Sequence, residues 1–555
     1  MAELLIQYMA PIMFAALVIL LLLGYPVAFA LAANGLIFGL VGIELGLFRP
    51  DFLQALPERV YGVMGNDTLL AIPFFTFMGL ILERSGMAED LLDTIGQLFG
   101  TIRGGLAYAV VFVGALLAAT TGVVAASVIS MGLISLPIML RYGYDRRVAS
   151  GVIAASGTLA QIIPPSLVLI VMADQLGRSV GDMYEGAFLP GLILAGLYAG
   201  YVFLMTIFFP KSVPGLPLEA VSFRDEKGKR GLPSLLALFI ASSAFGIAVM
   251  YRTSTRGADF VVLTMFFAII FAFAVAVVNW IVDRFFKFRF LSLLAQQVTF
   301  VMVPPLFLIF LVLGTIFIGV ATPTEGGAMG AVGAIVLAMI KRRLSWDLVR
   351  QAAESTAKLS AFVVFILIGA RVFSLTFYGV DGHRWVEHLL VSLPGGQLGF
   401  LVFVNVFVFV LAFFLDFFEL AFIVIPLLGP VAEKLGIDLI WFGVMLGVNM
   451  QTSFMHPPFG FALFYLRSVA PKEPYLDRIT GKRMEPVTTG QIYWGSVPFV
   501  VIQCIGVALV IAFPFLVTHY KSGNADVDSS NIKIDFQIQQ PDMPPPLDFS
   551  QPPPR

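Results

Sequence analysis

Two stretches with one shared pattern decide the fold: GYDRRVASGVIAASGTLAQIIPPSLVL at residues 143–169 and GIDLIWFGVMLGVNMQTSFMHPPFGFAL at residues 436–463. Each has a glycine and an aspartate near its start, a Gly-Val pair in the middle and two adjacent prolines near its end. Pro137 and Pro430 precede the two stretches by the same distance. A period of about 290 residues is too long for a solenoid and suits a transporter built from two similar halves.

The composition indicates a membrane protein. Of the 555 residues, 59% are hydrophobic and 12% are charged, whereas soluble domains are about half apolar and about a quarter charged. Apolar segments of about 20 residues recur along the chain, as bilayer-crossing helices require. The net charge of -1 provides no basic face for nucleic acid, and the single cysteine, Cys504, excludes an intrachain disulfide framework. We therefore predict an all-α polytopic membrane protein.

Two apolar stretches, 104–140 and 398–434, are interrupted centrally by AATTGVVAAS and FFLDFFELAF. We predict a re-entrant helical hairpin in each, which leaves about five spans in each half of the chain. Lysines and arginines gather in 211–231 and 467–491, so both segments are predicted to be cytoplasmic. Because the number of spans in a half is odd, the two halves are predicted to be inverted repeats.

The repeats divide the chain into four predicted parts. These are inverted repeat 1 (1–210), a cytoplasmic loop with two inserted spans (211–300), inverted repeat 2 (301–520) and a tail (521–555). The tail is rich in proline and poor in large apolar residues, which predicts disorder.

The paired prolines predict a break in a helix of each half. Proline lacks an N–H and clashes with the carbonyl four residues earlier. The carbonyls predicted to be freed are those of Ala160, Gln161, Ser453 and Phe454. In lipid each unpaired carbonyl costs several kcal/mol, so it is expected only at a protected site. Oxygen-rich breaks suit sodium, and the positive helix ends after the prolines favour an anion; a purely structural kink is the alternative.

The hairpin tips supply further candidates. Thr120, Thr121 and Gly122 occupy the first tip, and Asp416 and Glu419 occupy the second. Residues three apart share a helical face, and carboxylates at membrane depth are costly enough to suggest function. Capping of a hairpin turn by Asp416 is the alternative.

Two other charged residues have open interpretations. Glu325 opens a predicted helix that Thr322 or Thr324 could cap, which is a structural role, or it contacts an ion. Arg371 pairs with a substrate carboxylate, or it snorkels or forms a structural ion pair.

Several motifs resemble one family: GVATPTEGGA, GYDRRVASGVIAASGTLAQIIPPS, FFLDFFELAFIVIPLLGP and TSFMHPPFGFALFYLR. They resemble the large membrane subunit of tripartite ATP-independent periplasmic (TRAP) transporters, in the branch labelled mannitol or chloroaromatic, over most of residues 1–520. The resemblance implies an elevator-type, sodium-coupled importer of a small organic acid in the bacterial inner membrane. Its implied partners are a small membrane subunit of about four spans and a periplasmic solute-binding protein. The solute expected for this branch is a 2-oxo or hydroxy acid.

The motifs and the resemblance together place the predicted sites. Sodium is expected near Thr120, Thr121, Gly122, Ala160, Gln161, Asp416, Asn449, Ser453 and Phe454. The substrate is expected near Ser156, Thr158, Pro165, Ser166, Glu419, Gln451, Thr452, His456 and Pro458. No organic cofactor and no metal other than sodium is expected, because His383 and His388 do not share a helical face. His456 contacts substrate, adds a proton step or is structural.

The elevator hypothesis makes the hairpins and broken helices mobile. The spans at 9–41 and 303–341, with the connectors RVYGVMGND and WDLVRQAAES, would form the scaffold. The alternative function is a stand-alone sodium/divalent-anion carrier without a binding protein. An enzyme is not expected, since the sequence has no Walker loop, no H-E-x-x-H and no nucleophile elbow, and a channel suits inverted repeats less well.

Overall fold

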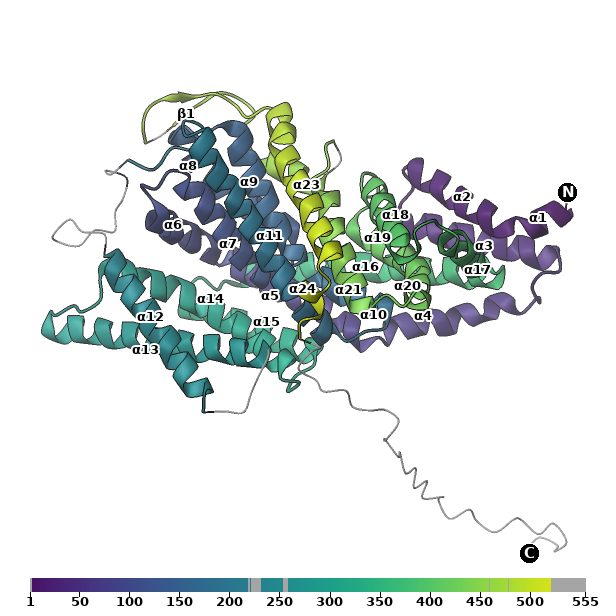
Figure 1. Cartoon of the computed structure of the whole chain (residues 1–555), viewed down its shortest axis with the longest axis horizontal. Helices are drawn as coiled ribbons and strands as arrows, with labels where there is room; N and C mark the ends of the chain where they lie inside the picture. The colour runs from purple at the N-terminus through teal and green to yellow at the C-terminus, as the bar shows by residue number, and fades with distance from the viewer. Residues whose placement is uncertain are drawn as a thin grey trace, which may run out of the picture.

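The computed structural model describes residues 2–217, 220, 231–252, 258–458, 460–477 and 479–520, without the side chains of Ala2, Leu4, Thr120, Thr121, Ala258 and Asp259. This part of the chain is nearly all helical (Figure 1). It has 9 helices long and apolar enough to cross a membrane, or up to 11 if each of two bent pairs counts as one span. Its strands are β1 (Tyr475–Leu476) and β2 (Arg483–Met484), an antiparallel pair.

The amino-terminal elements are α1 (Ala2–Gln7), α2 (Met9–Leu22), α3 (Val27–Glu44), η1 (Phe52–Ala55), α4 (Leu56–Met64), η2 (Asp67–Leu70), α5 (Ala71–Arg84) and α6 (Met87–Phe99). The connector RVYGVMGND, expected to be part of the scaffold, lies largely in α4, which ends at Met64. Helix α6 was not predicted, because Glu89 and Asp90 in its first turn interrupt its apolar pattern. Its buried face, which includes Leu91 and Ile95, makes it a core element.

The first predicted hairpin consists of α7 (Gly105–Thr121) and α8 (Val124–Arg141). Gly122 ends α7 in the left-handed conformation, with a φ of 57°, and a residue without a Cβ adopts this conformation at little cost. Two residues therefore suffice to reverse the chain between the two arms.

Both predicted helix breaks are present. The first half has α9 (Arg146–Thr158), η3 (Leu159–Gln161), the proline pair, α10 (Leu167–Leu176) and then α11 (Val180–Phe208). The second half has α21 (Leu439–Met450), η5 (Gln451–Phe454), the proline pair, α22 (Phe461–Val469), α23 (Thr489–Ala512) and α24 (Phe515–Thr518). Asp145 and Asp438, the shared aspartates of the repeat, each cap the helix that leads into the break. The repeated residues thus have the same local role in both halves.

The inserted segment contains α12 (Leu232–Met250) and α13 (Ala258–Phe286), which pack on each other and on α14 (Leu293–Phe317). They form a small hydrophobic cluster of their own around Leu238, Ala276 and Leu291. Most of the predicted cytoplasmic loop before them, including residues 221–230, lies outside the described residues, as does the predicted tail at 521–555.

The remaining elements are α15 (Pro323–Ile340), α16 (Trp346–Gly379), α17 (Gly382–Val391), α18 (Gly396–Leu411), α19 (Phe417–Ile423) and α20 (Ile425–Lys434). Helices α18 to α20 form the second predicted hairpin. The predicted connector WDLVRQAAES is not a separate element but the first turns of α16, because Ser345 caps a single helix that runs to Gly379. Its polar start and apolar remainder make up one long helix.

Glycines bring helices from the two halves into close contact. A Cβ on Gly35 of α3 would lie 2.7 Å from the Val372 carbonyl oxygen of α16, and a Cβ on Gly369 of α16 would overlap the Ala28 carbonyl of α3.

Figure 1 shows α7, α8, α9, α11 and α23 grouped together, and these helices also contact one another. The central part of the fold is thus built jointly by both halves.

Candidate functional site

A cavity of about 430 Å³ lies where the hairpin tips and the helix breaks meet; we call it the central cavity. Its walls come from the first tip, the first break, the second tip, the second break and α16. The lining residues are Gly122, Val123, Val124, Ala125, Gln161, Leu167, Val168, Leu359, Phe362, Asp416, Phe417, Phe418, Glu419, Phe454, Phe461 and Tyr465. Its volume is typical of a small-molecule site.

The first hairpin tip lies directly against the first break. A Cβ on Gly122 would lie 3.5 Å from the Pro165 carbonyl oxygen and 3.4 Å from Cγ of Leu167. The first tip, which was expected to lie opposite the broken helices, is thus in contact with the segment that follows the proline pair. The side chains of Thr120 and Thr121, which were predicted to bind sodium, lie outside the described residues.

At the first break, one polar side chain reaches the cavity. Gln161 lines the wall, and its buried side-chain oxygen accepts no hydrogen bond in the described part of the chain. Its backbone carbonyl is not free, contrary to prediction, because the hydroxyl of Ser166 donates to it. No described N–H donates to the carbonyl of Ala160. The break thus offers oxygen atoms with unused acceptor capacity.

Two predicted residues of the first break are engaged in packing instead. The hydroxyl of Thr158 donates to the Ala155 carbonyl at 2.8 Å and accepts a hydrogen bond from Gln503 of α23 at 3.3 Å. Ser156 is buried where α9 crosses α7 at Gly114. Neither lines the central cavity, and the same is true of Ala160, Pro165 and Ser166.

At the second break, the polar side chains mostly bond within the protein. The amide of Asn449 donates to the backbone and side-chain oxygens of Asn405 in α18, at 2.8 and 2.9 Å. The hydroxyls of Thr452 and Ser453 donate to the carbonyls three residues earlier, each at 2.7 Å. No described N–H donates to the carbonyls of Ser453 and Phe454, and Phe454 lines the cavity.

Other predicted substrate residues of this half lie away from the cavity. The ring of His456 stacks on Phe413, with centroids 4.0 Å apart, and packs edge-on against Phe409 at 4.4 Å. The carbonyl of Pro458 accepts a hydrogen bond from the Tyr493 hydroxyl. Gln451 is fully buried, and its side chain has no hydrogen-bond partner among the described residues.

The second hairpin tip places two carboxylates on the cavity wall. Asp416 accepts a hydrogen bond from the Glu419 N–H at 2.8 Å, and Glu419 accepts one from the Asp416 N–H at 2.9 Å. This reciprocal capping box starts α19. Thr322 and Glu325 form the same kind of box at the start of α15. The predicted capping by Asp416 and by Thr322 is therefore present in both places, but only Asp416 and Glu419 line the cavity.

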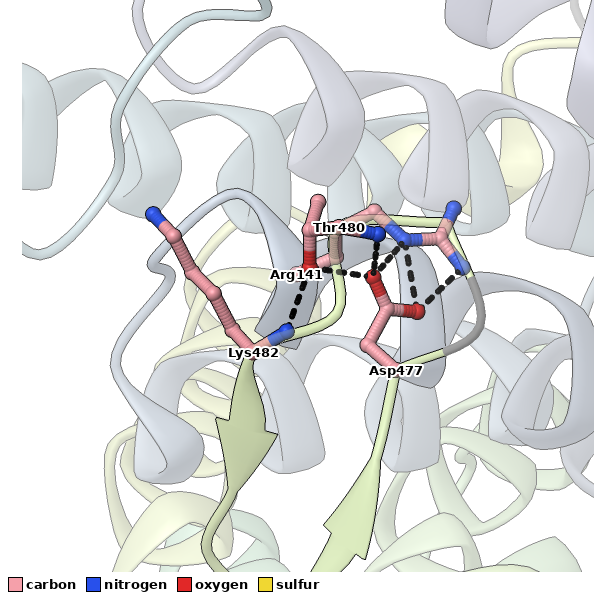
Figure 2. Close-up of polar contacts among 4 residues, drawn as sticks. All are labelled: Arg141, Asp477, Thr480 and Lys482. Carbon is pink, nitrogen blue, oxygen red and sulfur yellow. Dashed lines mark hydrogen bonds and ion pairs between the residues drawn. The ribbon is translucent and has the colours of Figure 1, made fainter.

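An ion pair joins the first hairpin to the second half of the chain, at the end of α8. Figure 2 shows Arg141 facing the carboxylate of Asp477, with Nη2 2.9 Å from Oδ1. The hydroxyl and N–H of Thr480 donate to the other carboxylate oxygen, at 2.6 and 2.9 Å. These partners hold the pKa of Asp477 well below its usual range. The loop after the second break is thereby fixed to the base of the first hairpin.

A comparison with known families identifies the chain. The model of the tripartite ATP-independent periplasmic transporter, DctM component, matches residues 14–516. The chain belongs to this family. It is therefore the large membrane subunit of a TRAP transporter, a protein of the bacterial inner membrane, and its relatives are permeases rather than enzymes. TRAP permeases work with a periplasmic binding protein and a small membrane subunit, so substrate import with such partners follows from the family. The predicted branch stays a prediction.

Three curated relatives illustrate the range of the TRAP family. The C4-dicarboxylate TRAP transporter large permease protein of Pseudomonas aeruginosa is 27% identical over 78% of this chain and 84% of its own length. The sialic acid TRAP transporter permease protein of Haemophilus influenzae is 23% identical over 90% of this chain and 66% of its own length. The ectoine TRAP transporter large permease protein of Halomonas elongata is 24% identical over 91% of this chain and 97% of its own length.

Sequence reasoning missed several cavity and support residues of this TRAP subunit. Leu359 and Phe362 of α16 and Tyr465 of α22 line the cavity, but nothing in an apolar helix marks the face that will meet another helix. Asn405 could have been found, because it is a lone amide within the apolar arm FVNVFV, and such residues usually have a partner.

Proposed function

We propose that this TRAP subunit imports a small organic acid together with sodium ions, and that a periplasmic solute-binding protein delivers the acid. The observation that carries the proposal is the central cavity, because segments from both halves converge there and supply its polar groups. A 2-oxo or hydroxy acid remains our preferred solute.

The charge of the central cavity supports sodium coupling. Asp416 and Glu419 line it, and no lysine, arginine or histidine is among its lining residues. An organic anion that entered such a site alone would meet two carboxylates in a medium of low dielectric constant. Cations must therefore accompany the acid, and their binding makes acid binding possible, which is the thermodynamic basis of coupling.

The oxygen atoms of the breaks fit sodium. The side-chain oxygen of Gln161 is buried without a donor, and the carbonyl of Phe454 receives no described backbone N–H; both residues line the central cavity. The carbonyls of Ala160 and Ser453 also receive no described backbone N–H, but these residues do not line the cavity. Neutral oxygens with spare lone pairs, beside carboxylates, are the ligand type that hard cations prefer. We assign the cation to this oxygen-rich wall, with Gln161 as the leading side-chain ligand. The positive end of α10, which opens at Leu167 on the same wall, would favour the carboxylate of the solute.

An elevator arrangement of inverted repeats is part of the proposal. It is supported by the matching order of aspartate cap, helix, 3-10 turn and proline pair in α9 to α10 and in α21 to α22. Helices α3 and α16, and helices α5 and α15, pack closely on each other, and these two pairs would serve as the scaffold. The two hairpins and the broken helices would then move together relative to it.

The test is uptake in liposomes that contain the chain with its small subunit. Labelled 2-oxo and hydroxy acids are supplied with an inward sodium gradient, with and without the binding protein. The proposal requires uptake that depends on both sodium and the binding protein. Sodium-driven uptake without the binding protein would favour the stand-alone carrier, and uptake indifferent to sodium would refute the coupling.

A further inference from the structure

A second cavity, of about 440 Å³, lies between α4, α16, the end of α10 and the second hairpin; we call it the outer cavity. Its lining includes Arg59, Asp174, Arg371, Tyr378, Phe422 and Glu433. It shares no lining residue with the central cavity. The basic segments 211–231 and 467–491, which are predicted to be cytoplasmic, adjoin the end of α11 and the start of α23. The outer cavity is lined by Asp174, Gln175 and Leu176, which lie just before the opposite end of α11, its start. The predicted orientation therefore places the outer cavity toward the periplasm.

The two arginines of the outer cavity lack acidic partners. Among the described residues, no carboxylate oxygen lies within 4.0 Å of the guanidinium of Arg59 or Arg371. Arg371 lies within an otherwise apolar span of α16, where a charged residue is costly and suggests a function. Each guanidinium presents planar donors that match a carboxylate.

The acidic residues of the same cavity already have partners. Asp174 accepts hydrogen bonds from Asn66 at 2.6 Å and from Gln175 at 2.8 Å. Glu433 pairs with Arg178 at 2.9 Å. Among the described charged groups that line the outer cavity, the two guanidiniums are therefore the ones without a partner, whereas the charged groups of the central cavity are carboxylates.

Helix α19 separates the two cavities. Phe418 lines the central cavity, and Phe422, one turn later, lines the outer cavity. Phe418 packs edge-on against Phe362 of α16, with centroids 6.3 Å apart. Farther along α16, Arg371 and Tyr378 face the outer cavity. An occupant of the outer cavity thus lies one helical turn of the hairpin away from the central cavity.

We propose that the outer cavity is a second binding site for small carboxylic acids, in which Arg59 and Arg371 hold the solute before it enters the central cavity. This role as a waiting site rests on the proposed function. Because the outer cavity supplies its own positive charge, acid binding there requires no sodium, whereas binding in the central cavity does. The sodium requirement therefore distinguishes the two sites.

The experiment measures the accessibility of a cysteine in the outer cavity. Ser374, which lines the cavity, is replaced in a S374C variant that also carries C504S. The complex with the small subunit is labelled, without sodium, with an anionic sulfonatoethyl or a cationic trimethylammonium-ethyl methanethiosulfonate. We expect the anionic reagent to react faster, and saturating pyruvate or malate to slow the reaction about tenfold relative to equal ionic strength of chloride.

Variants of the arginines decide the outcome. R59Q and R371Q should each remove the protection, and R371K should retain part of it, because the charge remains while the bidentate geometry is lost. R350Q is the matched control, since Arg350 is on the same helix but pairs with Glu354 outside the cavity. Absence of protection by both acids, or protection that survives R59Q together with R371Q, would overturn the proposal.

Uptake assays separate this proposal from the proposed function. With intact transport, R371Q should raise the half-saturating acid concentration and leave the half-saturating sodium concentration unchanged. If protection is observed while sodium-driven uptake fails, the outer site stands as a carboxylate site and the transport proposal falls. If uptake is normal and protection is absent, only the outer site is rejected.

Discussion

Compared position by position, the first helix break contributes the polar side chain of Gln161 to the central cavity, whereas the second contributes Phe454. The hairpin tips show the opposite assignment, since the first presents Gly122 and small apolar residues and the second presents Asp416 and Glu419. The two breaks have similar backbones, and so do the two hairpins, but they present different side chains to the cavity. The two halves thus differ in what they supply to the cavity: one provides a neutral side-chain amide and the other provides two carboxylates.

Removing a carboxylate from the second tip should produce the largest effect. Glu419→Gln keeps the capping box, which glutamine also forms, but removes a charge that would face the cation. We expect sodium-driven uptake to fall about 100-fold, because breaking a buried charge pair costs about 3 kcal/mol. Glu325→Gln changes the equivalent residue of the other capping box, at the start of α15 and outside the cavity, and this variant should transport normally. Equal losses in both variants would assign Glu419 a purely structural role.

The next largest effect is expected from Gln161, and Gln451 is its counterpart in the second half. The two glutamines lie in the 3-10 turns that follow α9 and α21. Gln161→Leu should raise the half-saturating sodium concentration about tenfold, since it removes one neutral ligand worth about 1.4 kcal/mol. Gln451→Leu should leave this concentration unchanged, because Gln451 does not line the cavity. Sodium titrations of uptake measure both values. A larger shift for Gln451→Leu would reverse the proposed division between the halves.

Asn449 of the second break is expected to contribute to stability and not to sodium binding. Its amide is occupied by Asn405, so Asn449→Ala should lower the free energy of unfolding by about 1 kcal/mol. Thermal unfolding of the detergent-solubilised complex checks this. In a double-mutant cycle, Asn405→Ala should add little to Asn449→Ala. Additive losses would show that the two amides act independently, and unchanged stability with weaker sodium affinity would restore Asn449 as a ligand.

The smallest effect concerns the anchor between the first hairpin and the loop after the second break. The pKa of Asp477 is depressed in the folded protein, so its stabilisation is complete above the ordinary aspartate pKa of about 3.9 and disappears as the pH falls below it. Asp477→Asn should slightly lower the unfolding temperature at neutral pH and flatten its decline on acidification. Thr480→Ala should do so to a lesser degree. An unchanged acid profile in Asp477→Asn would contradict the assigned pKa direction.

Much of this fold could be predicted because its breaks are local. Proline lacks a donor and glycine tolerates the left-handed region, so the proline pairs and Gly122 mark their own helix ends. By contrast, α6 was missed because its acidic first turn hides a buried face, and the start of α16 was separated from its span because polarity changes within one helix. Secondary structure that depends on tertiary burial leaves a weaker local signal.

The candidate site was predictable in part for the same reason. Gly122, Gln161, Asp416, Glu419 and Phe454 were named from the sequence and do line the central cavity. Others, such as His456 of the second break, instead pack against Phe409 and Phe413 at the end of α18. Spacing along a helix fixes which residues share a face, but which face meets the cavity depends on how α16 and the hairpins dock.

The close contact of α3 with α16 restricts which motions are possible. Gly35 and Gly369 each allow a backbone carbonyl of the partner helix to occupy the position of a side chain. If either helix advanced by one residue, a larger neighbour would replace the glycine at the contact, so the pair cannot slide in small steps. The displacement proposed for the second hairpin would therefore be taken up between α16 and α18, in residues 380–395, and not by sliding of α16 on α3. This connection is where linkers, labels and restraining antibodies should have the strongest influence on turnover.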